Sequence, residues 1–326
     1  MKYFSVFFIL LALSCSVGIP PSPGVEESLT EKPAIHKLKV LNTQLVNEDD
    51  QPVVLRGISY GWHNWWPRFY NEHTVKWLKD DWKVNVVRVA MGVEPEGAYL
   101  DRPEWSKQKV MAVIDAALAE DLYVIIDWHS HNIVQEEAKV FFSEMAQKYG
   151  DKPNVIYEIF NEPEKQSWEE VKTYSIDIIK AIRAHDPDNI ILIGSPNWSQ
   201  DLHIVANDPI EGFDNLMYTL HFYAATHKKW LRDRADYAME KGIPIFVSEC
   251  ASMLATGDGA IDHVSWQEWI DWMEDHKLSW ALWSLADKNE TCSMLLPSSS
   301  VKGKWTNKDL KPWGQMARDL LISKNR

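Results

Sequence analysis

Three shortages narrow the classes of protein that this sequence can encode. It has only three cysteines in 326 residues, which excludes a disulfide-based scaffold. Lysine and arginine together number 34 against 47 aspartates and glutamates, and the net charge of -13 repels phosphate backbones, so nucleic-acid binding is not expected. Beyond the N-terminus, no apolar run approaches the length needed to cross a membrane.

Tryptophan, by contrast, is abundant, with 17 copies against 10 phenylalanines. An indole offers a flat apolar face and one N–H donor, which suits polar ring-shaped ligands, although part of the excess must serve core packing. Hydrophobic residues make up 45% and charged residues 25% of the chain, an ordinary globular composition. The chain is long enough for one α/β barrel, which needs about 250 residues.

The N-terminus has the features of a secretory signal. Lys2 precedes an apolar run over residues 3–13 that is too short for a membrane-spanning helix. Residues 1–18 are therefore predicted to be a signal peptide, with ordinary cleavage after Gly18 as one route. In the alternative, Cys15 becomes the lipidated first residue of a bacterial lipoprotein and provides a lipid anchor. Either route predicts an exported protein, secreted or attached to the bacterial envelope.

The next segments suggest where the folded domain begins. Residues 19–36 combine proline with serine, glycine and glutamate, a composition that predicts a poorly ordered tether. Residues 37–326 remain for one folded domain. Two short apolar runs flank the turn-rich residues 47–50, which predicts a small β-hairpin leading into the first strand.

Eight short apolar runs then alternate with amphipathic segments. Most runs are almost continuously apolar, as expected for parallel strands that are buried on both faces. The predicted strands are Val54–Ser59, Val84–Met91, Tyr123–Trp128, Val155–Phe160, Ile190–Ile193, Leu216–Leu220, Ile243–Val247 and Leu278–Leu285. The predicted helices are Asn71–Trp82, Glu104–Glu120, Glu136–Tyr149, Trp168–His185, a short segment at Asp201–Asn207, Lys229–Lys241, Trp266–His276 and Pro312–Ser323. The alternation predicts a (β/α)8 barrel. An open doubly wound sheet would need a glycine-rich phosphate turn after its first strand, which residues 57–61 do not supply.

In such barrels the chemistry lies at the C-terminal ends of the strands. Six of the eight predicted strands carry polar or aromatic side chains there, including Arg88, His129, Asn161, Glu162, His221, Tyr223, Glu249 and Trp283. As a set they are poorly explained by packing, because buried polar groups must be paired. Glu162 and Glu249 follow the fourth and seventh strands, on opposite sides of the ring, so their carboxyl groups can face each other across a ligand.

Two opposed carboxyl groups suit cleavage of a glycosidic bond, because one protonates the leaving oxygen while the other attacks or activates water. A metal site is the main competitor. His129, His221 and the two glutamates could ligate zinc, but no HExxH or CxxC spacing is present. A Schiff-base barrel would need a lysine inside a strand, and none of the predicted strands contains one. We therefore expect a hydrolase that uses neither metal nor cofactor.

At residues 156–163 the sequence resembles the Asn-Glu-Pro signature of glycoside hydrolase family five, and it is most similar to the bacterial endoglucanases of that family. Similar segments continue in family order, so that the resemblance covers nearly the whole chain after the tether: residues 44–47, 77–82, 142–146, 198–201, 220–224 and 278–285. One departure stands beside Glu249, where Cys250 and Ala251 replace the usual aromatic residue and glycine.

The resemblance implies an endo-acting, retaining β-1,4-glucan hydrolase, that is, a cellulase. Glu162 would be the acid/base and Glu249 the nucleophile, and the negative charge of Glu249 would keep Glu162 protonated at the start. The implied substrate-binding residues are His63, Trp65, Arg88, His129, Asn161, His221, Tyr223, Trp283 and Lys288. Of the tryptophans in rim loops, Trp65 is the preferred candidate for stacking on a sugar ring.

Alternatives remain open at this point. A β-mannanase or a broad β-glucanase would use the same scaffold, and a non-catalytic envelope protein that binds glycans is a rival from another class. The expected partner is a β-glucan polysaccharide or oligosaccharide, and a monomer is expected. Cys250 and Cys292 fall in neighbouring rim loops, where they could form a disulfide or remain two thiols.

Overall fold

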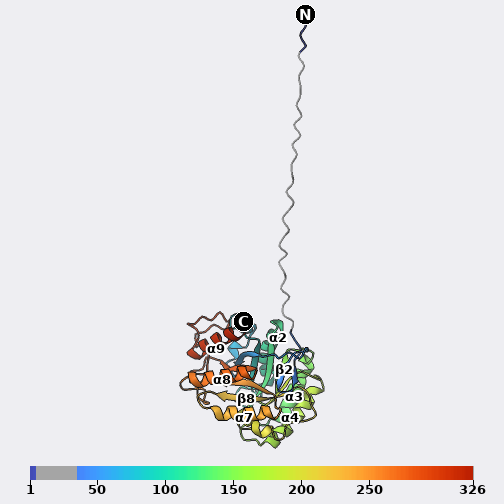
Figure 1. The fold of residues 1–326 in the computed structure, drawn as a ribbon, viewed down its shortest axis with the longest axis vertical. Coiled ribbons are helices and arrows are strands. Elements are labelled where there is room, and N and C mark those ends of the chain that lie inside the picture. Colours follow the sequence, from blue (N-terminus) through green and yellow to red (C-terminus); the bar gives the residue numbers. More distant parts are fainter. Residues whose placement is uncertain (5–34, 326) are drawn as a thin grey trace. The chain divides into compact units, whose positions relative to one another are not determined.

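The strands of the domain close into a barrel in the order β10-β3-β4-β5-β6-β7-β8-β9, and every neighbouring pair is parallel (Figure 1). This is a computed structural model that describes residues 1–4 and 35–325. The barrel strands are β3 (Arg56–Tyr60), β4 (Val86–Gly92), β5 (Tyr123–His129), β6 (Val155–Glu158), β7 (Ile191–Ile193), β8 (Leu216–Tyr223), β9 (Ile245–Ala251) and β10 (Trp280–Leu285). The predicted (β/α)8 barrel is confirmed. Cys15, the cleavage sites and residues 5–34 lie outside the described residues, so the leader and tether stay predictions.

Helices follow the strands and surround the barrel (Figure 1). They are η1 (Pro67–Phe69), α1 (Glu72–Asp80), α2 (Pro103–Ala119), α3 (Gln135–Tyr149), α4 (Trp168–Arg183), α5 (Pro196–Ser199), α6 (Leu202–Val205), α7 (Lys229–Glu240), α8 (His263–Asp275) and α9 (Pro312–Lys324). Local chemistry sets several of their ends. At α4 the Ser167 side chain accepts from the Glu170 backbone N–H while the Glu170 carboxylate accepts from the Ser167 N–H, a reciprocal cap. In the described part of the chain, no helix is long and apolar enough to span a bilayer.

The predicted hairpin is present, but its turn lies earlier than expected. Strands β1 (Lys39–Leu41) and β2 (Gln44–Val46) pair antiparallel around Asn42, whose φ is 55°. Asparagine tolerates this left-handed conformation, which tight hairpin turns require. Residues 47–50 form a second turn, after which the Val53 N–H donates to the Leu45 carbonyl at 2.9 Å.

The hairpin closes the end of the barrel at which the strands begin. Leu38 and Leu45 pack with apolar residues from the starts of the strands, among them Val86, Tyr123 and Phe246, in a separate buried cluster. The last described residue of the chain, Asn325, lies at the same end, where its side chain donates to the carbonyls of Arg56 and Lys83.

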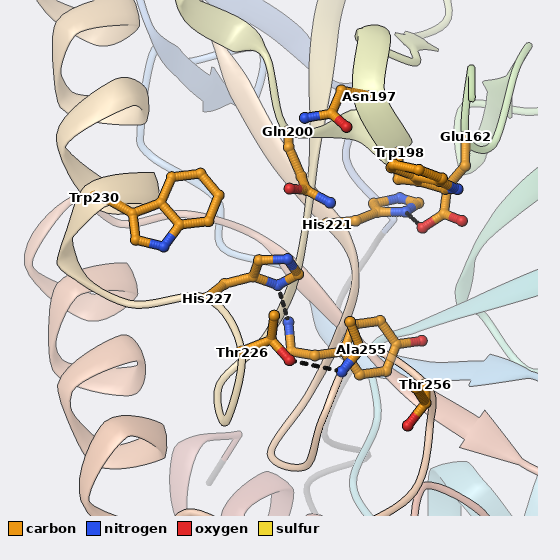
Figure 2. Close-up of a pocket in the computed structure, with 11 residues that line it drawn as sticks. Glu162, Asn197, Trp198, Gln200, His221, Thr226, His227, Trp230, Ala255 and Thr256 are labelled. Atoms are coloured by element: carbon orange, nitrogen blue, oxygen red, sulfur yellow. Dashed lines mark hydrogen bonds and ion pairs between the residues drawn. The ribbon is translucent and has the colours of Figure 1, made fainter. Parts of the chain in front are cut away.

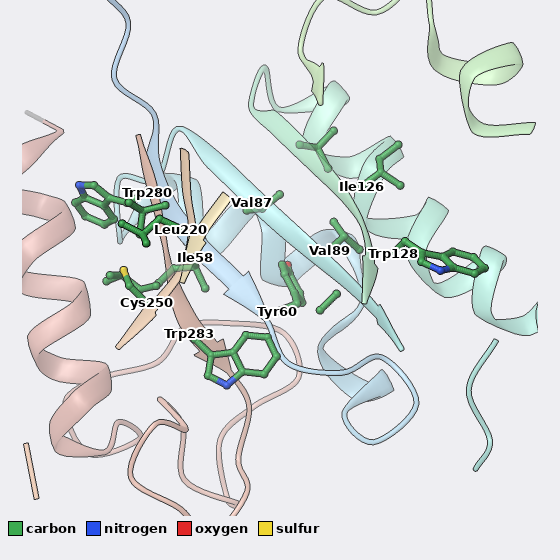
Figure 3. Packing of buried hydrophobic residues seen from close by; sticks show 14 of the residues in the cluster. Ile58, Tyr60, Val87, Val89, Ile126, Trp128, Leu220, Cys250, Trp280 and Trp283 are labelled. Atoms are coloured by element: carbon green, nitrogen blue, oxygen red, sulfur yellow. The ribbon is translucent and has the colours of Figure 1, made fainter. Parts of the chain in front are cut away.

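A larger cluster fills the space between the barrel and the helices. Trp128, at the end of β5, packs on the α3 rings Phe141 and Phe142, and Trp280 is equally buried at the start of β10 (Figure 3). Five tryptophans are fully buried in this way, so part of the tryptophan excess does serve packing: Trp82, Trp128, Trp269, Trp280 and Trp313.

Candidate active site

The structure brings the two predicted catalytic carboxylates together at the C-terminal end of the barrel. Glu162 lies in the loop after β6, and Glu249 lies within β9, across the ring from it. One carboxylate oxygen from each, together with a ring nitrogen of His221, all lie within 4.8 Å of one another. Both carboxylates belong to the wall of the barrel mouth, where a ligand can lie between them.

Glu249 is held by two donors. The Arg88 guanidinium donates through Nη1 to its Oε2 at 3.1 Å, and the Tyr223 hydroxyl donates to its Oε1 at 2.7 Å. Burial raises the pKa of Glu249, and the charge of Glu162 raises it further, against the lowering effect of His221 and Arg88. Tyr223 and Arg88 therefore fix the carboxylate with one face left for a ligand.

Glu162 is flanked by two histidines. His221 Nδ1 lies 2.9 Å from Oε1, and His131 Nε2 lies 3.3 Å from Oε2. Burial alone would raise the pKa of Glu162, but the hydrogen bonds from His131 and His221 outweigh it and lower the pKa to about 2. Burial likewise opposes protonation of His221, but its bonds to Glu158 and Glu162 raise its pKa to about 9.

The directions of the pKa shifts of Glu162 and His221 contradict one expectation. The charge of Glu249 was expected to keep Glu162 protonated, but the two histidines reverse the balance in the free site. One proton is therefore shared by the His221–Glu162 pair, and it rests on the imidazole.

Glu162, His221 and Glu249 were considered, together with His129, as zinc ligands, and the chemistry of His221 does not fit a metal. A metal needs a free lone pair on a neutral imidazole nitrogen. Both nitrogens of His221 are engaged, Nδ1 with Glu162 and Nε2 with the Ser248 hydroxyl at 2.9 Å, and the ring is held in its charged form. The cationic ring of His221 already supplies the positive charge that neutralises the carboxylates of Glu162 and Glu249.

Beneath Glu249, Arg88 is the centre of a buried ionic cluster. It is fully buried and forms ion pairs with Asp127 at 3.0 Å, with Glu158 at 2.7 Å and with Glu249 at 3.1 Å. Arg88 was predicted as a residue of the site, but its partners Asp127 and Glu158 were not. Asp127 and Glu158 are charged residues inside otherwise apolar strands, which is the signal that would have identified them.

Asn161 and His129 present polar atoms next to this cluster. The side-chain oxygen of Asn161 accepts from Arg88 Nη2 at 2.6 Å, while its buried Nδ2 finds no partner among the described residues. His129 Nδ1 lies 2.7 Å from Asp127, and burial lowers the pKa of His129 well below its usual value. The neutral ring donates to Asp127 and keeps Nε2 as an acceptor. Each residue thus offers one group that a sugar hydroxyl can bind.

Trp283 and the rim tryptophans form aromatic surfaces around these groups. Trp283 is 7% exposed and lies parallel to the His129 ring, with centroids 5.2 Å apart. Trp62 contacts His129 edge-on at 4.3 Å and also packs on Trp65, which is 52% exposed. The aromatic surface therefore extends from His129 outward to solvent.

A cleft continues on the other side of Glu162. It has a volume of about 570 Å³ and is lined by Glu162, Trp198, His221, Tyr223 and Trp230, together with smaller polar residues. Figure 2 shows Trp230, on α7, on one side of this pocket, and Glu162 and Trp198 on the other. Exposed tryptophans thus follow two opposite strands of the ring, Trp65 after β3 and Trp198 after β7, in an open site that can hold an extended ligand.

One expectation changes. His63 is fully buried, with Nε2 2.8 Å from the Ser106 hydroxyl and Nδ1 accepting from the Gly92 N–H at 3.0 Å, so neither nitrogen is available to a ligand. It supports the loop after β3 instead. Lys288 lies in the loop after β10 and pairs with Glu290 at 2.5 Å, with its side chain half exposed. Cys250 and Cys292 are both buried free thiols, which settles the disulfide question in favour of two thiols.

The chain is similar to several known proteins. The family model described as "Cellulase (glycosyl hydrolase family 5)" matches residues 46–289. An endoglucanase of Clostridium saccharobutylicum is 42% identical over 296 residues, which cover 89% of this chain and 66% of that protein. The chain spans 56–66% of the length of the first curated relatives that it matches.

Solved structures match over nearly their whole length. One from Cytophaga hutchinsonii is 45% identical and superposes with a TM-score of 0.86, covering 89% of this chain and 95% of that one. The catalytic domain of a Thermobifida fusca endoglucanase, solved in complex with cellotetraose, is 33% identical with a TM-score of 0.83, covering 88% of this chain and 98% of that one.

Proposed function

The chain belongs to glycoside hydrolase family 5, the cellulase family, and on that premise we propose that it is an endo-acting, retaining hydrolase of β-1,4-glucan. The observation that carries the proposal is the opposition of Glu162 and Glu249, with carboxylate oxygens within 4.8 Å of each other. Retaining enzymes hold their carboxyl groups roughly 5–5.5 Å apart, whereas inverting enzymes leave roughly 6.5–9.5 Å for a water molecule.

In the first step, Glu249 attacks the anomeric carbon while Glu162 gives a proton to the departing glycosidic oxygen. Arg88 and Tyr223 both donate to Glu249, so they favour the ionised form needed for attack, against burial and the charge of Glu162. The product of this step is a glycosyl ester on Glu249. In the second step, Glu162, now ionised, takes a proton from water, and the water oxygen displaces the ester with net retention.

The proton for the first step comes from the His221–Glu162 pair. Below a pH of about 9 the pair holds one proton, which rests on His221 in the free site. Transfer along the 2.9 Å contact to Glu162 delivers it to the carboxyl group that faces the leaving oxygen. Glu162 acts as the acid once this proton has moved from the imidazole to its carboxyl group, a transfer that the two pKa values oppose in the free site.

The substrate assignment draws on the shape of the site and on the relatives. Exposed Trp65 and Trp198, which follow the opposite strands β3 and β7, suit a chain that extends beyond the cleavage point in both directions, as endo-action requires. The unpartnered Asn161 Nδ2 suits the 2-hydroxyl of the sugar at the cleavage point. Endoglucanases are the named relatives, and one was solved with cellotetraose.

The experiment that tests this function compares initial rates on carboxymethylcellulose, lichenan and β-mannan, with viscosity measured alongside reducing ends. We expect the highest activity on a glucan and a rapid fall in viscosity. Equal or greater activity on mannan than on both glucans would replace the cellulase by a mannanase. Binding without any hydrolysis would favour a glycan-binding protein. Proton NMR should show the β-anomer first, and an initial α-anomer would refute retention.

We also propose that the protein is exported, either with residues 1–18 as a cleaved signal or with a lipoprotein signal that ends before Cys15, which then serves as the lipid anchor point. The test is the mass of the mature protein isolated from cells, compared with that of a Cys15→Ala variant. A diacylglycerol adduct that disappears in the variant supports the anchor. An unmodified protein that starts after Gly18 supports ordinary secretion.

A further inference from the structure

A carboxylate that the sequence analysis did not single out lies beneath the catalytic pair. Glu158, the last residue of β6, is fully buried and binds both the Arg88 guanidinium and the Ser248 hydroxyl. We infer that Glu158 is a positioning residue, which ties the arginine that serves Glu249 to the histidine that serves Glu162 and keeps that histidine protonated. The inference rests on the proposed function, because it assigns how the two carboxylates are coordinated.

On the nucleophile side, Arg88 is anchored by two of its nitrogens. Nε donates to Glu158 Oε2 at 2.7 Å and Nη2 donates to Oε1 at 3.2 Å. The remaining nitrogen, Nη1, donates to Glu249 Oε2 at 3.1 Å. Since the guanidinium is planar and rigid, fixing two of its nitrogens on Glu158 also determines where the third one points. Glu158 therefore orients the nucleophile without touching it.

On the acid side, His221 Nε2 lies 3.5 Å from Glu158 Oε1, and Ser248 bridges the two residues. The Ser248 hydroxyl donates to Glu158 Oε1 at 2.7 Å, so the hydroxyl oxygen is free to accept from His221 Nε2, which lies 2.9 Å away. The opposite ring nitrogen, Nδ1, lies 2.9 Å from Glu162 Oε1. A ring that donates at both nitrogens is an imidazolium. The direction of these bonds thus favours the proton store that the first catalytic step uses.

Asp127 does not share this position, although it also pairs with Arg88. Its second partner is His129, which stacks on Trp283 away from the acid side. Among the described residues, Glu158 is the carboxylate whose hydrogen bonds reach both Arg88 and Ser248.

The charge of His221 depends on groups from several strands. Those that face it are Arg88 on β4, Asp127 and His129 on β5, Glu158 and Glu162 at and after the end of β6, Tyr223 on its own strand β8, and Glu249 on β9. Burial opposes the charged ring, and the hydrogen bonds with Glu158 and Glu162 outweigh it. Loss of the Glu158 charge should therefore favour neutral His221, and it should also leave Arg88 more strongly paired with ionised Glu249.

The test is the pH dependence of kcat/KM for Glu158→Gln, which keeps the shape of the side chain and removes its charge. We expect kcat to fall about 10- to 100-fold with KM little changed, as for a small misplacement of reacting groups. Both limbs of the profile should move to lower pH, the alkaline one by roughly 1–3 pH units. Ser248→Ala removes the bridge but leaves the 3.5 Å contact between His221 Nε2 and Glu158 Oε1, so it should move the alkaline limb alone and by less than Glu158→Gln does.

Glu274→Gln is the matched control. Arg56 donates to Glu274 through Nε at 3.0 Å and Nη2 at 2.9 Å, the same bidentate arrangement, but at the far end of the barrel. This variant should lower stability and move neither limb. If Glu158→Gln behaves like this control, with an unmoved profile, Glu158 is merely structural and the inference is overturned.

Proton titration of His221 by NMR, assigned with a His221→Gln variant, needs no substrate and separates this inference from the proposed function. A lower His221 pKa in Glu158→Gln supports the inference even if the wild-type protein hydrolyses no glucan. An unchanged value refutes it even if the protein is a cellulase. If Glu158→Gln does not fold, the same titration on Ser248→Ala decides, with a lowered His221 pKa expected and an unchanged one contradicting the link.

Discussion

The two ends of the barrel bury opposite kinds of side chain. Where the strands begin, Leu38, Leu45 and Phe246 form an apolar cluster, and the ion pair nearby, Arg56 with Glu274, stays partly exposed. Where the strands end, Arg88 and Glu158 are fully buried beneath the catalytic carboxylates. Burying charges costs free energy that their mutual attraction only partly returns, whereas apolar burial is favourable throughout. The comparison indicates that one end stabilises the fold while the other end holds the proposed catalytic pair at the expense of stability.

The largest effect expected at the catalytic end is that of Glu249→Gln. Without its nucleophile the protein should lose at least about 10⁴-fold in kcat on carboxymethylcellulose. Its Tm should not fall, because the substitution removes a buried charge close to Glu162. Steady-state kinetics and thermal unfolding measure both quantities. A variant that stays active, or one that is strongly destabilised, contradicts the contrast between the two ends.

Glu162→Gln should have the next largest effect. Its kcat on polysaccharide should fall about 10²–10⁴-fold, which is the usual contribution of a general acid. On an aryl glycoside with a good leaving group much of this loss should disappear, because that group needs little protonation. Glu249→Gln should show no such recovery under the same conditions. If recovery occurs in Glu249→Gln instead, the two roles must be exchanged.

Leu45→Ala probes the opposite end. Removal of this buried side chain should lower the free energy of unfolding by about 2–5 kcal/mol and leave kcat of the folded protein unchanged. Leu41, on the same hairpin, is 43% exposed, so Leu41→Ala should have little effect on either quantity. Chemical denaturation and kinetics at a temperature well below the transition measure the two. A loss of kcat without a loss of stability would show that the ends are not separable.

The pH profile of kcat/KM should be bell-shaped, with a change of about tenfold per pH unit on each limb. On the acid side Glu249 becomes protonated above the usual glutamate range, because its pKa is raised. On the alkaline side the His221–Glu162 pair loses its proton near pH 9.

The contribution of His221 to stability should also be lost at alkaline pH, because the pKa of His221 in the folded protein lies above its ordinary value of 6.5. Its contribution is complete below that value and is lost as pH rises through about 9. Measurement of unfolding and activity from acid to alkaline pH tests both. An alkaline limb at or below the ordinary histidine range would contradict the shared proton.

The smallest effect is expected for Trp65→Ala. Stacking on an exposed indole contributes about 0.5–1.5 kcal/mol, so KM for long oligosaccharides should rise several-fold while kcat stays nearly constant. Trp65→Phe, which keeps a flat ring, should restore most of the affinity. Unchanged KM in Trp65→Ala would remove this residue from the binding surface.

The sequence alone predicted the barrel and most of its site for a physical reason. Strands buried on both faces must be almost continuously apolar, so that all eight were visible, and polar residues at their ends then stood out. Glu162, Glu249, Arg88 and Tyr223 were identified by that rule together with the resemblance. The turn at Asn42 was missed because a single asparagine is a weaker signal than the polar run at residues 47–50.

The remaining errors share a cause, which is that the sequence shows a residue but not its partners. His63 was expected in the site, yet Ser106 and Gly92 occupy both of its ring nitrogens. His131 was overlooked because it follows β5 by two residues, although the loop turns it back to Glu162. The charge balance between Glu162 and Glu249 depends on such contacts over long sequence distances, and no local pattern could have predicted it.

The hairpin and the last described residue have one more consequence, which concerns how the domain can be connected. The hairpin and Asn325 both lie at the end where the strands begin, opposite the catalytic side chains. Both ends of the described domain, residues 35 and 325, therefore lie at one pole of the barrel, the end at which the strands begin. New termini opened in a loop at that pole, with residues 35 and 325 joined by a short linker, should give a circular permutant that keeps its cleft, and barrels joined in tandem through the same pole should leave every cleft unobstructed.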